Sequence, residues 1–386
     1  MSPSDARARL AFGEVCGRRL QRHGLADPLP GDDPAVAAAA MCGAHAQVMS
    51  AAELSVGLRL ADVTVSGVRA ALWKRGTLVK TFGPRGTVHL LAARDLPHWL
   101  SALSALPRSR GVPEPSARLT ADQTEGVVSA IADALAEAEL TLEELGSQVI
   151  DRTGPWAGDL VLPAFREMWP RWRQAIGTAA HRGALCFGRG RGRAVTYTSP
   201  ARWLRTPRPS ADSALRWVLL EYLRAYGPAT PAHLAQWLAA PRPWAAELFA
   251  ACRDDLEEVL VDGVPMWVVA GDTAASRPHG VRLLPYFDAY AVGCHPRERL
   301  FPGAAAERAL TRGQAGNRPV LLVDGVVAGV WHHRRTGRRI DITVEPLTTL
   351  AAARRRLLDA EVERLGVILE GAAEARLGAV TVGPHA

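Results

Sequence analysis

Two short glycine-containing segments concentrate arginine, and their residue types suggest a specific chemistry. Residues 188–193 place an arginine at every second position, and residues 332–339 contain four arginines after two histidines. Glycine lets the backbone approach a phosphate closely, and arginine neutralises the phosphate while releasing counterions. The predicted DNA-binding residues are these arginines with two more near a third hairpin: Arg75, Arg85, Arg189, Arg191, Arg193, Arg334, Arg335, Arg338 and Arg339.

The total charge is less informative than its distribution. The 386 residues contain 46 Lys+Arg against 39 Asp+Glu, for a formal charge of +7. Only Lys74 and Lys80 are lysines, which leaves 44 arginines. A GC-rich genome explains such an excess, and so does selection for bidentate phosphate contacts that lysine cannot make. Solvated hairpin tips also tolerate arginine without any ligand, but two dense clusters favour a phosphate-binding surface.

Several function classes lack their motifs. The chain has no GxSxG, Walker A or HExxH sequence. Its five cysteines are scattered without CxxC spacing, so we expect no metal and no cofactor. No uncharged apolar run reaches the length of a membrane span, and the N-terminus has no signal-peptide core. With 48% apolar residues the chain can bury large cores. We expect a cytoplasmic, nucleoid-associated protein.

Three segments share one pattern, in which helices are followed by a strand–turn–strand unit. In the first, Ser50 and Glu53 predict a capping box before a helix, and a hairpin follows with its tip at residues 83–86. In the second, Thr141 predicts another capping box, before a hairpin in residues 184–198. Helices followed by a hairpin of this size are typical of winged-helix domains.

The third segment has the clearest pattern. Residues 212–226 form an amphipathic stripe that ends before a Gly-Pro pair. Thr230 then predicts an N-cap with proline at the first helical position. Asp262 and Gly263 predict a two-residue hairpin turn.

Beyond Arg282 the pattern changes to alternating strands, with turns at residues 324–325 and 336–337 and a closing helix over 348–370. The prediction is an α+β protein with three tandem winged-helix domains and a C-terminal β-barrel-like domain. The linkers are expected at residues 107–116, 206–210 and 273–279. The predicted domains are residues 1–115, 116–208, 209–280 and 281–386.

Six stretches together resemble the AlkZ/YcaQ-like winged-helix DNA glycosylases of bacteria. They occur in the family's order and span most of the chain. They are MCGAHAQVMSAAEL (41–54), FGPRGTVHLLAARD (82–95), ALCFGRGRGRAVTY (184–197), LLEYLRAYGPATPAHLAQWL (219–238), VRLLPYFDAY (281–290) and VDGVVAGVWHHRR (323–335). The resemblance implies a C-shaped DNA-binding channel and excision of alkylated purines or crosslinks from double-stranded DNA.

The resemblance also implies the catalytic residues. The family's motif of two polar residues around an apolar one falls on residues 45–47, so the catalytic residues would be His45 and Gln47. Histidine at the first position resembles a branch linked to self-resistance against DNA-alkylating antibiotics. Tyr286 and Asp288 are candidates to line the channel, and the alternative is that residues 286–288 form a buried turn beside a strand.

The implied reaction suits these residues. An N7-alkylated guanine is cationic and leaves readily, so an enzyme needs mainly to position a water and stabilise the sugar cation. Histidine can accept a proton from that water, and a glutamine amide can hold it. Lysine scarcity argues against a Schiff-base mechanism and predicts a monofunctional glycosylase. The enclosing channel that the resemblance implies fits a monomer best. The alternatives are a non-catalytic winged-helix DNA-binding protein or regulator, and a hydrolase with another substrate.

Overall fold

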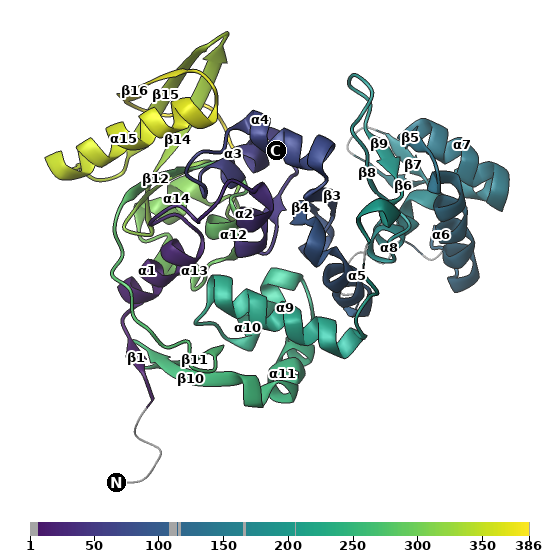
Figure 1. The fold of residues 1–386 in the computed structure, drawn as a ribbon, viewed down its shortest axis with the longest axis horizontal. Coiled ribbons are helices and arrows are strands. Elements are labelled where there is room, and N and C mark those ends of the chain that lie inside the picture. The colour runs from purple at the N-terminus through teal and green to yellow at the C-terminus, as the bar shows by residue number, and fades with distance from the viewer. Residues whose placement is uncertain (1–6, 108–113, 115–116, 165–166, 205, 386) are drawn as a thin grey trace.

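The computed structural model describes residues 7–107, 114, 117–164, 167–204 and 206–385 (Figure 1). Helices alternate with small sheets of two to five strands, so the predicted α+β class is confirmed. Figure 1 shows the elements α6–α8 and β5–β9 as a lobe set to one side of a larger body.

The first segment forms the part of the body next to this lobe. Its sheet has the strand order β2-β4-β3, and its hairpin turns at residues 83–86 as predicted. A π-helical turn, Ala71–Arg75, continues α4. The elements are α2 (Pro34–Ala40), β2 (Ala44–His45), α3 (Met49–Gly57), α4 (Val65–Ala70), β3 (Leu78–Phe82), β4 (Val88–Ala92) and α5 (Leu96–Ala105).

The predicted capping box in this segment is wrong. Helix α3 begins at Met49 with Val48 as its N-cap residue and no side-chain cap, so Ser50 lies within the first turn. Glu53 is buried and receives two hydrogen bonds from Arg69, of 2.7 and 2.8 Å. A bidentate arginine–carboxylate contact is stronger than the single neutral bond of a capping box. The side chain of Glu53 therefore points to α4 rather than to the helix start.

The second segment forms the lobe and has a core of its own, which includes Val149 and Trp172. Thr141 forms the predicted capping box with Glu144. An additional hairpin, β6–β7, was not predicted. The elements are α6 (Ala121–Leu135), β5 (Glu139–Thr141), α7 (Leu142–Thr153), β6 (Leu160–Pro163), β7 (Met168–Pro170), α8 (Ile176–His181), β8 (Cys186–Phe187) and β9 (Thr196–Thr198).

The third segment confirms both predicted signals. Thr230 accepts a hydrogen bond from the His233 backbone N–H, and Asp262–Gly263 connects two paired strands. The N-terminal residues, which the prediction assigned to the first domain, join this segment, because β1 pairs in parallel with β10. The elements are β1 (Arg9–Leu10), α1 (Phe12–Arg22), α9 (Ala211–Tyr226), α10 (Pro231–Leu238), α11 (Arg242–Ala251), β10 (Leu256–Val261) and β11 (Val264–Val269).

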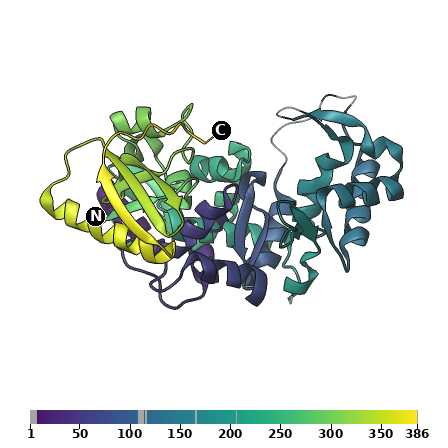
Figure 2. The same ribbon diagram turned by 90° about the horizontal axis from the view of Figure 1, so that it is seen from above.

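The C-terminal segment contains a five-stranded sheet of order β12-β13-β14-β15-β16, an open half-barrel rather than a closed barrel. Helix α15 packs beside this sheet (Figure 2) and is shorter than predicted. The elements are β12 (Val281–Leu284), α12 (Ala289–Gly293), α13 (Arg297–Leu300), α14 (Ala304–Ala309), β13 (Val320–Val323), β14 (Val326–Thr336), β15 (Arg339–Pro346), α15 (Ala352–Ile368) and β16 (Ala372–Leu377).

A continuous core joins the first, third and C-terminal segments. It includes Trp99 of α5, Leu219 of α9 and Trp331 of β14. Burial of such apolar surface is the main force that holds these segments together. Residues 206–210 and 273–279 contain no helix or strand, as expected of linkers, whereas the predicted linker at 107–116 lies almost entirely outside the described residues.

Candidate active site

The segment that carries the predicted catalytic motif reverses sharply after α2. Cys42 and Gly43 have φ angles of 54° and 100°. A Cβ atom on Gly43 would lie 2.7 Å from the Leu91 side chain, so glycine is required there. Strand β2 then pairs antiparallel with β4, which places His45 directly opposite His89. The turn and the sheet together fix the backbone at the first motif residue.

His45 is half-buried and has an unusual environment. Neither ring nitrogen has a hydrogen-bond partner, and each exposes less than 1 Å². The imidazole lies between the rings of His89, at 5.2 Å between centroids, and Phe287, at 4.9 Å. Burial, with a smaller effect from the positive charge of Arg85, lowers the pKa of His45 to about 4. His45 is therefore a neutral imidazole at pH 7.

Gln47 lies two residues further along and is exposed. Between them, the Ala46 backbone N–H donates to the Val88 carbonyl at 2.7 Å, and the Ala46 side chain is buried in the core. Side chains alternate in an extended segment, so the two flanking side chains point away from that core. In the described part of the chain, no hydrogen bond occupies the Gln47 amide, which is free to hold a water or a sugar–phosphate oxygen.

His89 is a neighbour that the sequence analysis missed. Its Nδ1–H donates to the Thr87 carbonyl at 2.9 Å. Burial, with smaller effects of His45 and Arg85, holds its pKa well below the usual value. The alternation of side chains along the predicted hairpin shows which face of the strand His89 lies on. It does not show that His89 lies beside His45, because that depends on the pairing of β2 with β4. Two neutral imidazoles therefore lie next to each other on the neighbouring strands β2 and β4.

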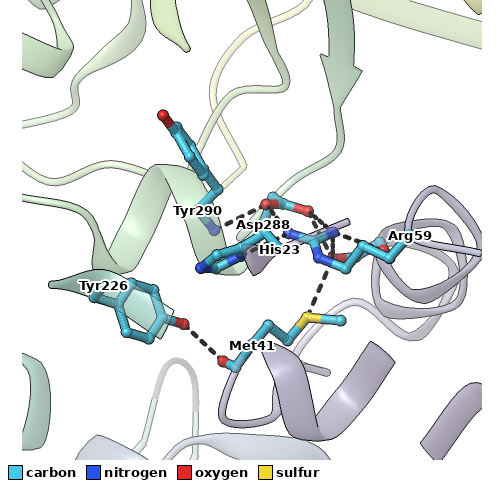
Figure 3. A network of polar contacts seen from close by, with 7 residues as sticks. His23, Met41, Arg59, Tyr226, Asp288 and Tyr290 are labelled. Atoms are coloured by element: carbon cyan, nitrogen blue, oxygen red, sulfur yellow. Dashed lines mark hydrogen bonds and ion pairs between the residues drawn. The ribbon is translucent and has the colours of Figure 1, made fainter. Parts of the chain in front are cut away.

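A buried ion pair lies beneath this region and joins the first and C-terminal segments (Figure 3). Both Nη atoms of Arg59 contact the Asp288 carboxylate, at 2.9 and 3.0 Å, and both side chains are fully buried. Ser55 Oγ and the Tyr290 backbone N–H also donate to it, at 2.6 and 2.9 Å. Burial alone would raise the pKa of Asp288, but the charge of Arg59 and these hydrogen bonds together lower it. Asp288 is therefore ionised and holds the start of α12.

The same network also contacts the chain just before the predicted catalytic motif, through α9. The Tyr226 hydroxyl, at the end of α9, donates to the Met41 carbonyl at 2.7 Å (Figure 3). The Arg59 Nη2 atom lies 3.4 Å from His23 Nδ1, and burial, with a smaller effect of Arg59, lowers the pKa of His23 to about 3. Neutral His23 can accept this bond, so the network carries no second buried positive charge.

The two candidates for lining a channel have different positions. Asp288 does not line an open surface, because its side chain is enclosed in the ion pair with Arg59. The alternative expectation, a buried turn beside a strand, describes the position of Asp288. Tyr286 is half-buried and its ring lies 5.7 Å from that of His385. The residue between them, Phe287, is the one that contacts His45.

The arginines of the β8–β9 hairpin divide into two groups. Arg191 is ion-paired with Glu144 in two contacts of 2.8 and 2.9 Å. This contact reaches back to the start of α7 and holds the hairpin against the lobe. Arg189 and Arg193 are exposed, and no ion pair occupies either side chain within the described residues. These two are available for a ligand.

The β14–β15 hairpin shows the same division. Arg339 pairs with Asp341 at 2.8 Å, and Arg335 donates to the Leu369 carbonyl at 2.6 Å. Arg334 and Arg338 are exposed and, over the described ranges, their side chains have no such partner. Three of the seven predicted arginines at these two hairpins, Arg191, Arg335 and Arg339, are thus bound within the fold.

The last two predicted arginines come from the first segment. Arg85 has a φ of 62° at the hairpin tip and donates to the Trp237 carbonyl at 2.8 Å, so it contacts the third segment. Arg75 is exposed beside a cavity of about 620 Å³ that Arg94 and Arg202 also line. Arginines of the first segment and of the lobe therefore line the same cavity.

Two other features are absent from the part of the chain that the structure describes. Across those residues, no group of three or more His, Cys, Asp or Glu side chains is arranged to hold a metal ion. Nor does any described helix combine the length and apolar character needed to cross a membrane.

Comparisons with known proteins agree with this architecture. A model of the family "DNA glycosylase AlkZ-like" matches residues 38–367. The chain is 30% identical over 343 residues to the interstrand DNA cross-link repair glycosylase of Streptomyces sahachiroi, covering 84% of this chain and 88% of that protein. It superposes on the solved structure of the S. sahachiroi DNA glycosylase AlkZ with a TM-score of 0.80 and 26% identity, over 96% of this chain and all of the other. The chain therefore belongs to the AlkZ-like family of DNA glycosylases, enzymes that hydrolyse N-glycosidic bonds.

Proposed function

We propose that this chain is a monofunctional DNA glycosylase that excises N7-alkylguanine and bulky alkylpurine adducts, with His45 and Gln47 as its catalytic residues. The observation that carries the proposal is the neutral, unpartnered imidazole of His45 two residues before an exposed amide. A glycosylase for cationic bases needs a positioned water, and these groups can supply one. The S. sahachiroi relative is named for interstrand crosslinks, so crosslinked DNA belongs among the substrates to test.

The proposed reaction balances without a cofactor. The oxygen of water bonds to C1′ of the sugar, and the bond from C1′ to the purine nitrogen breaks. Its electron pair neutralises the cationic base, which leaves, while the water proton passes to His45. A base with a pKa near 4 is weak, but a cationic leaving group requires little assistance. The amide of Gln47 orients the water or the sugar–phosphate.

The proposed DNA surface uses the arginines that the fold leaves unoccupied. Arg189 and Arg193 lie in the β8–β9 hairpin of the lobe, and Arg334 and Arg338 lie in the β14–β15 hairpin of the C-terminal sheet. Phosphate contacts from both would hold a duplex across the first segment. We further propose that the three segments with helices and a hairpin are winged-helix domains and that the protein acts as a monomer.

The test uses duplexes that carry N7-methylguanine, a bulky N7-guanine adduct or an interstrand crosslink. Released base is measured by mass spectrometry under single-turnover conditions. We expect His45→Ala and Gln47→Ala each to slow excision by about 10²–10⁴-fold while the dissociation constant for damaged DNA stays within a few-fold of wild type. An equal loss of binding and rate would mark both residues as structural. A sequence-specific footprint without base release would support the non-catalytic DNA-binding alternative.

The biological setting is a separate proposal. Histidine at position 45 resembles the branch that protects producers of DNA-alkylating antibiotics, and we propose DNA repair in this self-resistance role. Expression of the chain in a sensitive bacterium should raise survival under such an antibiotic, and the His45→Ala variant should not.

A further inference from the structure

Phe287 has a backbone conformation that needs support from its neighbours. Its φ angle is 54°, in the left-handed region that costs energy for a residue with a side chain. Its backbone N–H donates to the Gly316 carbonyl at 2.9 Å. A Cβ atom on Gly316 would lie 2.8 Å from the Phe287 ring, so only glycine allows this approach. Gly316, which lies far from this turn in sequence, therefore helps to hold the Phe287 ring in position.

The adjacent residue supplies further support. Asp288 is held by Arg59, Ser55 and the Tyr290 backbone in the buried network. Ser55 belongs to α3, the helix that follows the predicted catalytic motif, and Arg59 comes directly after the C-cap residue of that helix, Leu58. The network therefore ties the Phe287 turn of the C-terminal segment to the segment that carries His45, although the two are separated by more than two hundred residues.

The Phe287 ring ends against the His45 imidazole. Their centroids lie 4.9 Å apart with an angle of 84° between planes. The other groups that face this imidazole are His89 from β4 and the positive charge of Arg85 from the hairpin tip. On its outer side, the Phe287 ring contacts His385 near the C-terminus, at 5.5 Å. An apolar ring thus separates His45 from an exposed histidine.

We propose that Phe287 is the positioning residue of His45: its ring covers the imidazole in the free protein, excludes bulk water and sets the ring orientation. The inference rests on the proposed catalytic role of His45. His89 is held by strand pairing and by its bond to Thr87. Phe287 is half-buried, and its ring is held through its turn, by the contact with Gly316 and by the buried network at Asp288.

The proposal predicts two effects of Phe287→Ala that do not depend on each other. Water enters beside His45, so diethyl pyrocarbonate, which acylates accessible neutral imidazoles, should reach its ring nitrogens. Water also stabilises the charged imidazolium, so the pKa of His45 should rise from about 4 toward the ordinary value. The active neutral form is then lost as the pH falls through the new pKa.

The first experiment measures acylation of His45 at pH 7 by peptide mass spectrometry, with the exposed His279 as an internal standard. In wild type, His45 should react at least about tenfold more slowly than His279, because both of its nitrogens are covered. In Phe287→Ala the two rates should become similar. Phe287→Leu keeps an apolar cover and should remain close to wild type. Equal protection in wild type and Phe287→Ala would overturn the proposal.

The second experiment compares single-turnover excision at pH 7.5 and pH 5.5. Wild type should change little, because His45 stays neutral at both values. If the pKa of His45 in Phe287→Ala reaches about 6.5, only about a tenth of it is neutral at pH 5.5, so the rate should fall about tenfold. A rate that falls equally at both pH values would indicate a general structural defect and refute the positioning role.

A matched control removes a different half-buried aromatic side chain. Trp244 lies on α11 in the third segment, and Trp244→Ala should change neither the acylation of His45 nor the pH profile. Thermal unfolding of each variant checks that it is folded at the assay temperature. If wild type releases no base from any duplex, the proposed reaction fails, and the acylation experiment still decides whether Phe287 covers His45.

Discussion

Asp288→Asn tests whether the buried ion pair holds the catalytic region together. Four hydrogen bonds reach the Asp288 carboxylate, two from Arg59 and one each from Ser55 and the Tyr290 backbone. Asparagine keeps the size of the side chain but removes its charge. Its NH₂ group is a hydrogen-bond donor and would lie against groups that are themselves donors, so some of these hydrogen bonds are lost. Arg59 then remains fully buried with an uncompensated positive charge.

The expected cost follows from this geometry. Removing one partner of a buried pair typically destabilises a protein by about 3–5 kcal/mol, because the remaining charge is left in a medium of low dielectric. We expect a loss of about 4 kcal/mol in the free energy of unfolding, at the centre of that range. Because the folded pKa of Asp288 is lowered, its contribution is present above the unfolded pKa and is lost as the pH falls through the folded value.

Urea unfolding at pH 7, followed by tryptophan fluorescence, measures this cost. Asp341→Asn is the matched control, because it removes the same group from an exposed pair with Arg339 and should leave stability almost unchanged. The double variant Asp288→Asn/Arg59→Met should recover much of the loss, because no buried charge remains. A cost of less than about 1 kcal/mol for Asp288→Asn would refute the view that this pair holds the two segments together.

Three further predictions concern charge. Replacing Arg334 and Arg338 with glutamine should reduce the slope of log binding constant against log salt by about two, measured by fluorescence anisotropy with duplex DNA; an unchanged slope would place this hairpin away from the DNA. Acid should destabilise the fold, because burial lowers the pKa of both His23 and His295 to about 3. Below pH 6.5 each of these histidines can lower the free energy of unfolding by up to about 1.4 kcal/mol per pH unit. Equal urea midpoints at pH 7 and pH 4.5 would contradict this prediction. Borohydride should trap no covalent adduct with damaged DNA, because the chain has only two lysines; a trapped adduct would exclude the monofunctional mechanism.

Local signals in the sequence predicted local structure well where nothing distant competed with them. Thr141 and Thr230 cap their helices as expected, and Asp262–Gly263 forms its turn. Each of these signals depends on contacts within a few residues. The capping box at Ser50 failed because Arg69, sixteen residues away, takes the Glu53 carboxylate in two strong hydrogen bonds.

The candidate site shows the same limit. The resemblance implied His45 and Gln47 as the catalytic residues, but their environment depends on residues far along the chain. Asp288, expected to face a channel, is buried against Arg59, 229 residues away. Phe287 reaches His45 only because that ion pair and Gly316 hold its turn in place.

The sequence alone determined the helix caps at Thr141 and Thr230, the hairpin turns and the family, because these depend on residue types and short spacings. Tertiary structure decided which arginines remain available and which are bound to Glu144, Asp341 or backbone carbonyls. It also decided that His45 is neutral and covered. The physical reason is that burial and charge pairing are set by everything that surrounds a group, and most of those neighbours are distant in sequence.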